Sequence, residues 1–169
     1  MNVTSPQLET PLPPVKRLPQ ELADSTTFLL KRLGFAAKEQ AMAAYEQTGL
    51  HPYHHAILIA LSEGSHKTQG SIADALGYDR GQLVGLLDEL EEHGLVERRR
   101  DPEDRRRHVV SLTPEGKKAL GRMRAVARQN EDAFLDPLSD DERTTLHSLL
   151  LQLAKKHDPR CANLPARSK

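Results

Sequence analysis

Residues 68–113 constrain the fold more than any other stretch, because two short segments with apolar periodicity run directly into a basic hairpin. The first, TQGSIADALG, begins at Thr68, whose hydroxyl can cap a helix, and ends at Gly77. The second, DRGQLVGLLDELEEHG, begins at the capping residue Asp79 and ends at Gly94. Its leucines share one helical face, at Leu83, Leu86, Leu87 and Leu90. The pattern predicts two consecutive helices, the second with one buried face.

The stretch after Gly94, LVERRRDPEDRRRHVVSLT, has the pattern of a β-hairpin. Apolar strand formers lie on either side of a turn signal at Asp101-Pro102. Six arginines surround that turn, at Arg98, Arg99, Arg100, Arg105, Arg106 and Arg107. A helix pair followed by a hairpin with a basic tip is the layout of a winged helix-turn-helix. Such a unit places one helix in the major groove of DNA and its hairpin tip against the neighbouring minor groove.

The candidates for DNA contact lie at the starts of the two helices and at the hairpin tip. Arginine can pair bidentately with guanine and glutamine with adenine, so we expect Arg80 and Gln82 to read bases. Arginine at the tip needs no base code, because the negative potential of a narrow minor groove attracts it. The complete candidate set is Thr68, Gln69, Asp79, Arg80, Gln82, Arg105 and Arg106.

Carboxylates in the same region are expected to stay away from phosphate. The second half of the 79–94 helix is acidic, with Asp88, Glu89, Glu91 and Glu92. Because like charges repel, that half should tilt away from DNA and leave the first half to enter the groove. Asp104 lies among the tip arginines, and we expect it to hold the tip loop or aim an arginine.

The order of motifs through residues 75–116 resembles the MarR family of bacterial transcription regulators. The family pattern is a leucine-rich helix running into Asp-x-Leu-Glu-x-x-Gly-Leu-Val, then a basic strand, an Asp-x-Arg tip, and Ser-Leu-Thr before a long helix. The matching residues are Asp88, Leu90, Glu91, Gly94, Leu95, Val96, Asp104, Arg106, Ser111, Leu112 and Thr113. The likeness is strong over residues 50–116 and extends to the flanking helices by pattern only.

This resemblance implies roles for two wing residues: Asp104 steadies the wing, and Arg106 enters the minor groove. Two positions depart from the family pattern. Gly85 stands where many members carry a polar or basic residue, and Asp79 replaces the commoner serine. The base preference of the family therefore does not carry over to this chain.

Length and composition exclude several classes of protein. A chain of 169 residues suits one domain with a full core, and its formal net charge of +0 excludes nucleic-acid coating by bulk charge. The aromatic content of 4% argues against stacking platforms for single strands. Neither a membrane-span pattern nor a signal-peptide core is expected. A single cysteine, Cys161, fits a cytoplasmic location.

The flanks of the winged unit predict long helices. We expect a flexible, proline-rich arm over residues 1–17, and one long helix over 18–50 that begins near Leu18. The winged unit should cover 51–113, a pair of helices 114–157, and a polar tail 158–169. The predicted fold is therefore mostly α-helical with a small β-hairpin wing: a winged helix-turn-helix flanked by long N- and C-terminal dimerisation helices.

The apolar surface of the flanking helices exceeds what the winged unit needs, which predicts a homodimer; the resemblance implies the same. A two-fold dimer presents its recognition helices about one turn of DNA apart, so the operator should be a pseudo-palindrome in double-stranded DNA.

The resemblance also suggests a small-molecule effector. In many MarR relatives a small aromatic acid or similar anion binds between the first long helix, the next helix and the winged unit, and weakens DNA binding. By chain order Phe35, Tyr53, His54 and His55 fall near that cleft. Histidine and tyrosine can orient a carboxylate while phenylalanine packs against a ring. An ordinary core-and-rim role for these four residues fits equally well, so both interpretations stay open.

Two sensor chemistries have weaker support. His51 and His55 have the i, i+4 spacing that can hold zinc on a helix, and some relatives sense zinc, but no recognised ligand motif accompanies the pair. We therefore predict no metal and no cofactor, and keep a zinc-responsive regulator as an alternative. Cys161 lies in the tail, whereas oxidation-sensing relatives carry their cysteine in the first helix, so an incidental role is expected.

Besides a repressor that an effector releases from DNA, two other functions are considered for this sequence. An enzyme is disfavoured, because the sequence contains no Gly-x-Ser-x-Gly, P-loop or dinucleotide-binding glycine pattern. A winged-helix module for protein contact, without operator binding, is the remaining alternative. The six arginines of the hairpin argue against it.

Overall fold

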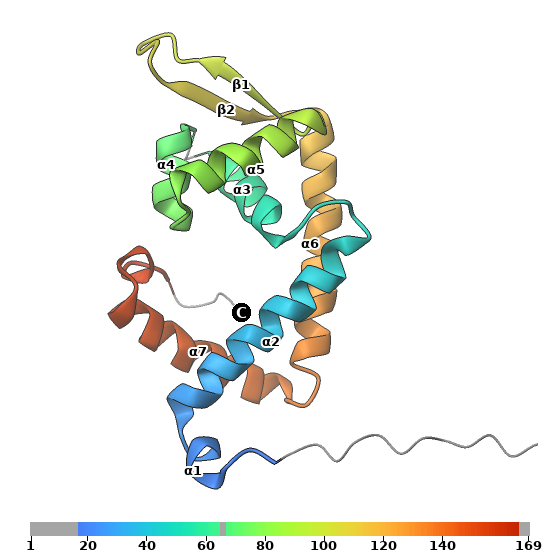
Figure 1. The fold of residues 1–169 in the computed structure, drawn as a ribbon, viewed down its shortest axis with the longest axis vertical. Coiled ribbons are helices and arrows are strands. Elements are labelled where there is room, and N and C mark those ends of the chain that lie inside the picture. Colours follow the sequence, from blue (N-terminus) through green and yellow to red (C-terminus); the bar gives the residue numbers. More distant parts are fainter. Residues whose placement is uncertain (1–16, 65–66, 166–169) are drawn as a thin grey trace, which may run out of the picture. The chain divides into compact units, whose positions relative to one another are not determined.

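The computed structural model describes residues 17–64 and 67–165 (Figure 1). The chain divides into two compact units, Met1–Ala36 and Ala37–Lys169. Of the arm predicted over residues 1–17, all but Arg17 lies outside the described residues, as do residues 166–169 of the predicted tail.

The first unit corrects the prediction of one continuous helix from Leu18. It contains the short helix α1, Gln20–Ala23, and the start of α2, Thr26–Glu46, which ends in the second unit. The break has a local cause. The Ser25 hydroxyl accepts a hydrogen bond from the Phe28 N–H at 3.3 Å, so Ser25 caps a new helix rather than continuing the first.

The second unit confirms a mostly helical fold with a β-hairpin wing. Helix α3 is followed by the helix pair α4 and α5, then by the hairpin β1–β2, and then by two further helices and a single 3-10 turn (Figure 1). Their bounds are α3 Pro52–Ser62, α4 Gln69–Leu76, α5 Arg80–Glu92, β1 Val96–Arg100, β2 His108–Leu112, α6 Pro114–Phe134, α7 Asp140–His157 and η1 Pro159–Cys161.

Side-chain caps start these helices where the sequence predicts them. Thr68 accepts from the Ser71 N–H at 3.1 Å, and Asp79 accepts from the Gly81 N–H at 2.8 Å. Thr113 accepts from the Gly116 N–H at 3.0 Å and so starts α6. Each cap satisfies an amide that has no partner within its helix.

The core lies between α3, α4, α5, the hairpin and the first half of α6. The four leucines predicted for the buried face of α5 are all buried. Packed with them are Ile57 and Leu58 of α3, Ile72 of α4, Val110 of β2 and Met123 of α6. The core fixes the two helices of the pair and the wing as one body.

The wing is an antiparallel pair in which Val96 faces Leu112 and Arg100 faces His108. The Lys67 carbonyl accepts a hydrogen bond from the Val110 N–H of β2 at 2.7 Å. The hairpin is thereby attached directly to the segment that leads into α4.

Within residues 17–64 and 67–165, no helix combines the length and the hydropathy that crossing a lipid bilayer requires.

At Gly116, helix α6 passes close to the backbone that follows α5. A Cβ atom at Gly116 would overlap the backbone carbonyl oxygen of Leu95. Gly116→Ala should lower the free energy of unfolding by about 1–3 kcal/mol, because backbone has to shift to admit the methyl group. Gly121→Ala is the matched control on the same helix, since nothing lies within 4 Å of its Cβ.

The control should gain about 0.5–1 kcal/mol from helix propensity. Urea unfolding of both variants measures the difference. Equal stability of the two variants would contradict the close approach at Gly116.

Candidate nucleic-acid interface

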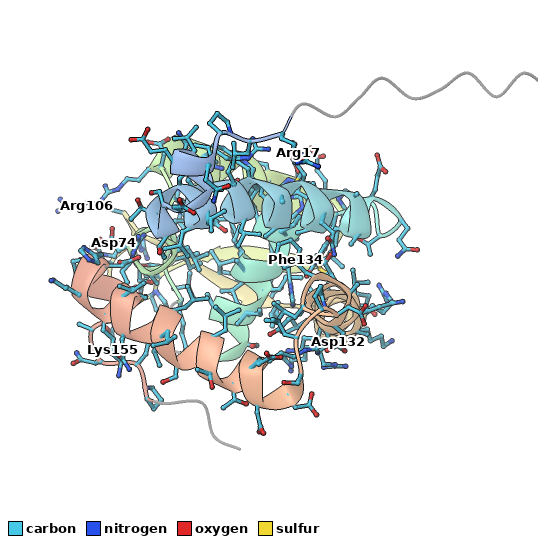
Figure 2. All side chains as sticks on the ribbon, turned by 90° about the horizontal axis from the view of Figure 1, so that it is seen from below. Arg17, Asp74, Arg106, Asp132, Phe134 and Lys155 are labelled. Carbon is cyan, nitrogen blue, oxygen red and sulfur yellow. The ribbon has the colours of Figure 1, made fainter. Side chains whose placement is uncertain are left out.

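A groove of about 610 Å³ opens where the start of α4, the start of α5 and the wing meet. Thr68 and Gln69 line it from α4, Arg80 from α5, and Arg106 from the wing. Figure 2 labels Arg106 and Asp74, which line the groove from the wing and from α4. The structure thus brings four of the seven predicted DNA-binding residues to one surface, although their contacts with DNA stay a prediction.

In the first turn of α5 two side chains are exposed to solvent, while the capping side chain of Asp79 binds the backbone of the turn. Arg80 and Gln82 are exposed, and Gln82 lies on the same turn without lining the groove. The Asp79 carboxylate accepts the N–H groups of Gly81 and Gln82 at 2.8 and 3.2 Å. Asp79 therefore positions the helix start through its Oδ1 atom.

The wing tip is organised around Asp104. Its Oδ1 accepts the Arg106 N–H at 3.1 Å, and its Oδ2 lies 3.2 Å from Nε of Arg107. In the part of the chain that the structure describes, the side chains of Arg105 and Arg106 form no ion pair and extend into solvent. The role of Asp104 in holding the tip stays a prediction, which this geometry supports.

Arg98 differs from the tip arginines, and grouping it with them at the sequence level was wrong. Its guanidinium donates to Oε2 of Glu91 at 2.9 and 2.6 Å and also pairs with Asp88. Its N–H donates to the other oxygen of Glu91 at 3.0 Å. The hydrogen bonds from Arg98 hold the pKa of Glu91 below its usual value. Arg98 therefore joins β1 to the acidic half of α5.

The residues predicted to bind an effector do not contact one common partner; each has its own neighbours. His55 and His54 are both buried, and Nδ1 of His55 lies 2.6 Å from the Tyr45 hydroxyl of α2. The ring of Tyr53 packs edge-on against Tyr78 at 5.5 Å between centroids. Phe35 is exposed and belongs to the first unit. Effector binding by these residues stays a prediction.

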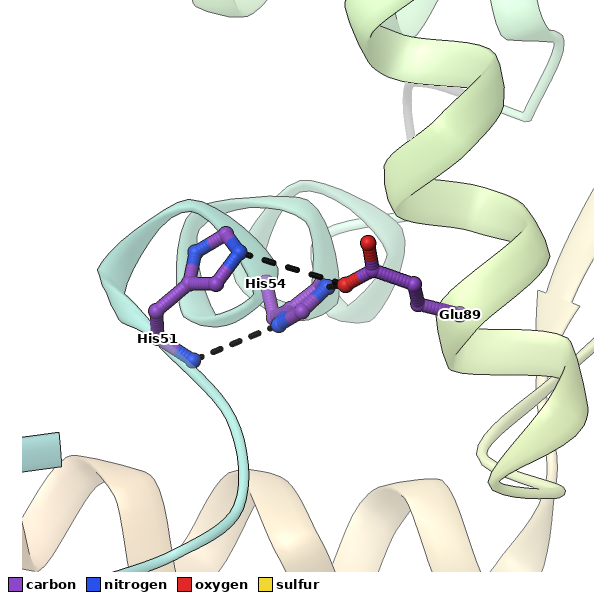
Figure 3. Close-up of side chains that lie close together, drawn as sticks. All are labelled: His51, His54 and Glu89. Carbon is purple, nitrogen blue, oxygen red and sulfur yellow. Dashed lines mark hydrogen bonds and ion pairs between the residues drawn. The ribbon is translucent and has the colours of Figure 1, made fainter. Parts of the chain in front are cut away.

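His54 instead belongs to a cluster with His51 and Glu89 (Figure 3). Its Nε2 lies 2.9 Å from Oε2 of Glu89, and Nε2 of His51 lies 4.0 Å from the same oxygen. The two imidazole rings stack with centroids 3.9 Å apart. Burial, together with the nearby His51, lowers the pKa of His54 to about 4, so the ring is neutral at pH 7.

The i, i+4 spacing considered for His51 and His55 does not hold in the structure. His51 is the N-cap of α3, with an extended backbone at φ −133° and ψ 171°, so helical i, i+4 geometry does not apply to it. Its N–H donates to Nδ1 of His54 at 3.3 Å, which brings the third residue of the helix back toward the cap. The third member of the cluster is Glu89 of α5, which spacing along the chain did not reveal.

Comparison with known proteins identifies the family. Residues 48–107 match the sequence model of the MarR family. A protein of Thauera aromatica, named as the transcriptional regulatory protein for the hcr operon, is 36% identical over 141 residues, covering 78% of this chain and 84% of that protein.

Two solved structures of the regulator CouR have the same fold. The transcriptional repressor CouR bound to a 23-mer DNA duplex is 33% identical, with a TM-score of 0.74, over 82% of this chain and 99% of that one. CouR from Rhodococcus jostii RHA1 bound to p-coumaroyl-CoA is 28% identical, with a TM-score of 0.68, over 80% and 96%. The chain belongs to the MarR family and is a DNA-binding transcriptional regulator, not an enzyme.

Proposed function

We propose that the protein is a homodimeric repressor that binds a pseudo-palindromic operator in double-stranded DNA and is released by a small aromatic or anionic effector. The groove between α4, α5 and the wing tip carries this proposal. It combines two helix starts with an arginine that has no ionic partner among the described residues. A cytoplasmic location follows from a role on bacterial DNA.

The charges around the groove favour entry by the first half of α5. Arg80 and Gln82 occupy the exposed first turn, where the side chains that can read bases are needed. Asp88 and Glu91 lie further along the helix and are paired with Arg98, so phosphate meets less negative charge there. Arg105 and Arg106 then reach the adjacent minor groove from the wing.

Exposed leucines on α7 support the dimer. Helix α7 has no buried residue within the single chain. Leu149 is 54% exposed and Leu153 46% exposed, although both carry large apolar side chains. In the first unit Leu33 is similarly exposed on α2. Contact between two copies would bury these surfaces and place two recognition helices on one face of DNA.

An effector fits the same scheme. The related CouR structure binds p-coumaroyl-CoA, a molecule with both an aromatic ring and anionic groups. In this chain we assign the effector to the neighbourhood of Tyr53, His54 and His55 on α3. A ligand there would move α3 relative to α5 and change the spacing of the two recognition helices.

The experiment that tests the proposed function is selection of bound fragments from random double-stranded DNA by the purified full chain. Two inverted half-sites centred about one helical turn apart are the expected result. Recovery of fragments without a shared sequence would overturn operator binding and favour the protein-contact alternative.

Arg106→Ala should weaken binding to the selected duplex at least roughly tenfold, because the minor-groove contact is lost. The expected secondary-structure content and dimer mass are unchanged, since the side chain is exposed at the tip. Arg122→Ala, which removes an equal charge from the exposed surface of α6, is the matched control. Fluorescence anisotropy at fixed salt measures both affinities; an equal loss in both variants would remove the special role of Arg106.

The Arg98–Glu91 pair should stabilise the wing without touching DNA. Arg98→Gln leaves two carboxylates facing each other across its former position, so both stability and DNA affinity should fall. A double-mutant cycle with Glu91→Gln should give a coupling free energy of about 1 kcal/mol, reduced because Glu91 is part-exposed. Urea unfolding of the four proteins measures the coupling, and strictly additive effects would show that the contact does not hold the wing.

Leu153→Glu should shift the protein from dimer to monomer, because a carboxylate cannot be buried in an apolar interface without a partner. Gln152→Glu places the same charge on the neighbouring exposed position and should leave the dimer intact. Light scattering during size-exclusion chromatography gives the mass of each variant. A dimer that survives Leu153→Glu would place the interface elsewhere.

A further inference from the structure

The cluster of His51, His54 and Glu89 lies outside the DNA-facing groove and joins α3 to α5 (Figure 3). One nitrogen from each histidine and one oxygen from the glutamate lie within 4.8 Å of one another. Two of these residues come from the start of α3 and the third comes from the acidic half of α5. The three candidate donor atoms therefore converge across a helix–helix contact.

His54 has a buried ring nitrogen without a hydrogen-bond partner. Its side chain is only 2% exposed, and its Nε2 has no hydrogen bond of acceptable geometry although Glu89 lies 2.9 Å away. Buried polar atoms in native proteins are normally paired, so this nitrogen points to a partner that the protein chain does not supply.

We propose that Nε2 of His51, Nε2 of His54 and a carboxylate oxygen of Glu89 bind one Zn²⁺ ion. Two imidazoles and one carboxylate form a donor set that zinc accepts, whereas magnesium and calcium prefer oxygen alone. The site deepens the proposed function, since it adds a metal to the regulation of the recognition helix.

The three donor atoms lie within 4.8 Å of one another, so a tetrahedral ion requires the side chains to move closer together. Ligand atoms around tetrahedral zinc are about 3.3 Å apart, given bonds of about 2.0–2.1 Å. The separations from Glu89 Oε2, 2.9 Å to His54 and 4.0 Å to His51, fall on either side of that value. The Glu89 side chain is 54% exposed, so it is free to rotate, and solvent can fill the fourth position.

Zinc binding requires a change in which ring nitrogen of His54 carries the proton. Because Nδ1 of His54 accepts the His51 N–H, the neutral ring carries its proton on Nε2. Zinc at Nε2 requires the other tautomer, with the proton on Nδ1. The ion therefore displaces the 3.3 Å capping bond, which is long for an N–H donor, and replaces it with a coordinate bond.

Zinc should also change DNA binding, and this step rests on the proposed function. Two neutral imidazoles and one carboxylate carry a local charge of −1, which the ion changes to +1. That positive charge would lie on the acidic half of α5, where DNA phosphate is otherwise repelled. Loading the site should therefore tighten binding to the selected duplex.

The test is calorimetric titration of the full, metal-stripped protein with Zn²⁺, followed by Co²⁺ as a spectroscopic probe. We expect one ion per chain and the visible absorption of tetrahedral cobalt. Glu89→Gln and His51→Gln should each weaken zinc binding at least tenfold while keeping the fold, since both side chains reach solvent. Glu92→Gln, on the same helix and exposed, is the matched control and should bind as the parent does.

Absence of stoichiometric zinc binding, or affinity unchanged by Glu89→Gln, would overturn the site. Anisotropy on the selected duplex then tests the coupling: zinc should tighten the parent at least threefold and leave Glu89→Gln unchanged. An unchanged parent affinity would overturn the regulatory step. If zinc binds as expected but no duplex is selected, the operator proposal fails and the metal site stands, so the two failures are distinguishable.

Discussion

Burial of one leucine face of α5 is the constraint on which the groove between α4, α5 and the wing depends. Leu83 is 1% exposed and Leu87 0%, so this face cannot turn toward solvent without losing about 1.5–3 kcal/mol for each side chain. With that face fixed against α3, α4 and α6, the opposite face of the first turn is the one that remains exposed. The same packing positions the end of α5, from which the wing begins.

Positive and negative side chains lie on different parts of the winged unit, although the chain as a whole carries no net charge. The formal net charge is +0, yet three arginines, Arg80, Arg106 and Arg107, line the groove against one carboxylate, Asp74. Arg98 compensates the acidic half of α5 from inside the wing, and Asp104 organises the tip while Arg106 stays unpaired. A protein built in this way can approach phosphate at one surface without binding polyanions everywhere.

Features that depend on local sequence could be predicted. Thr68, Asp79 and Thr113 cap helices because their side-chain oxygens reach amides only two or three residues away. The leucine face of α5 follows from helical periodicity, and the hairpin follows from its turn signal. In each case the partner lies within a few residues of the signal, so one sequence is enough.

Features that depend on tertiary contact could not be predicted. Arg98 resembles its neighbours in sequence, and only the return of β1 along α5 brings it to Glu91. The spacing of His51 and His55 suggested neighbours on one helix face, but His51 lies outside the helix as its N-cap, which depends on the backbone conformation. The join between α1 and α2 was missed although Ser25 is a recognised capping residue type, since apolar periodicity continued through it.

In the proposed complex, α5 and the wing tip contact one DNA duplex at the same time. Hydroxyl-radical footprinting on the selected operator tests this simultaneous contact, because the radicals report the minor-groove face of each sugar. We predict protected minor-groove segments beside each half-site, with the half-sites about one helical turn apart. A footprint without minor-groove protection would contradict the account.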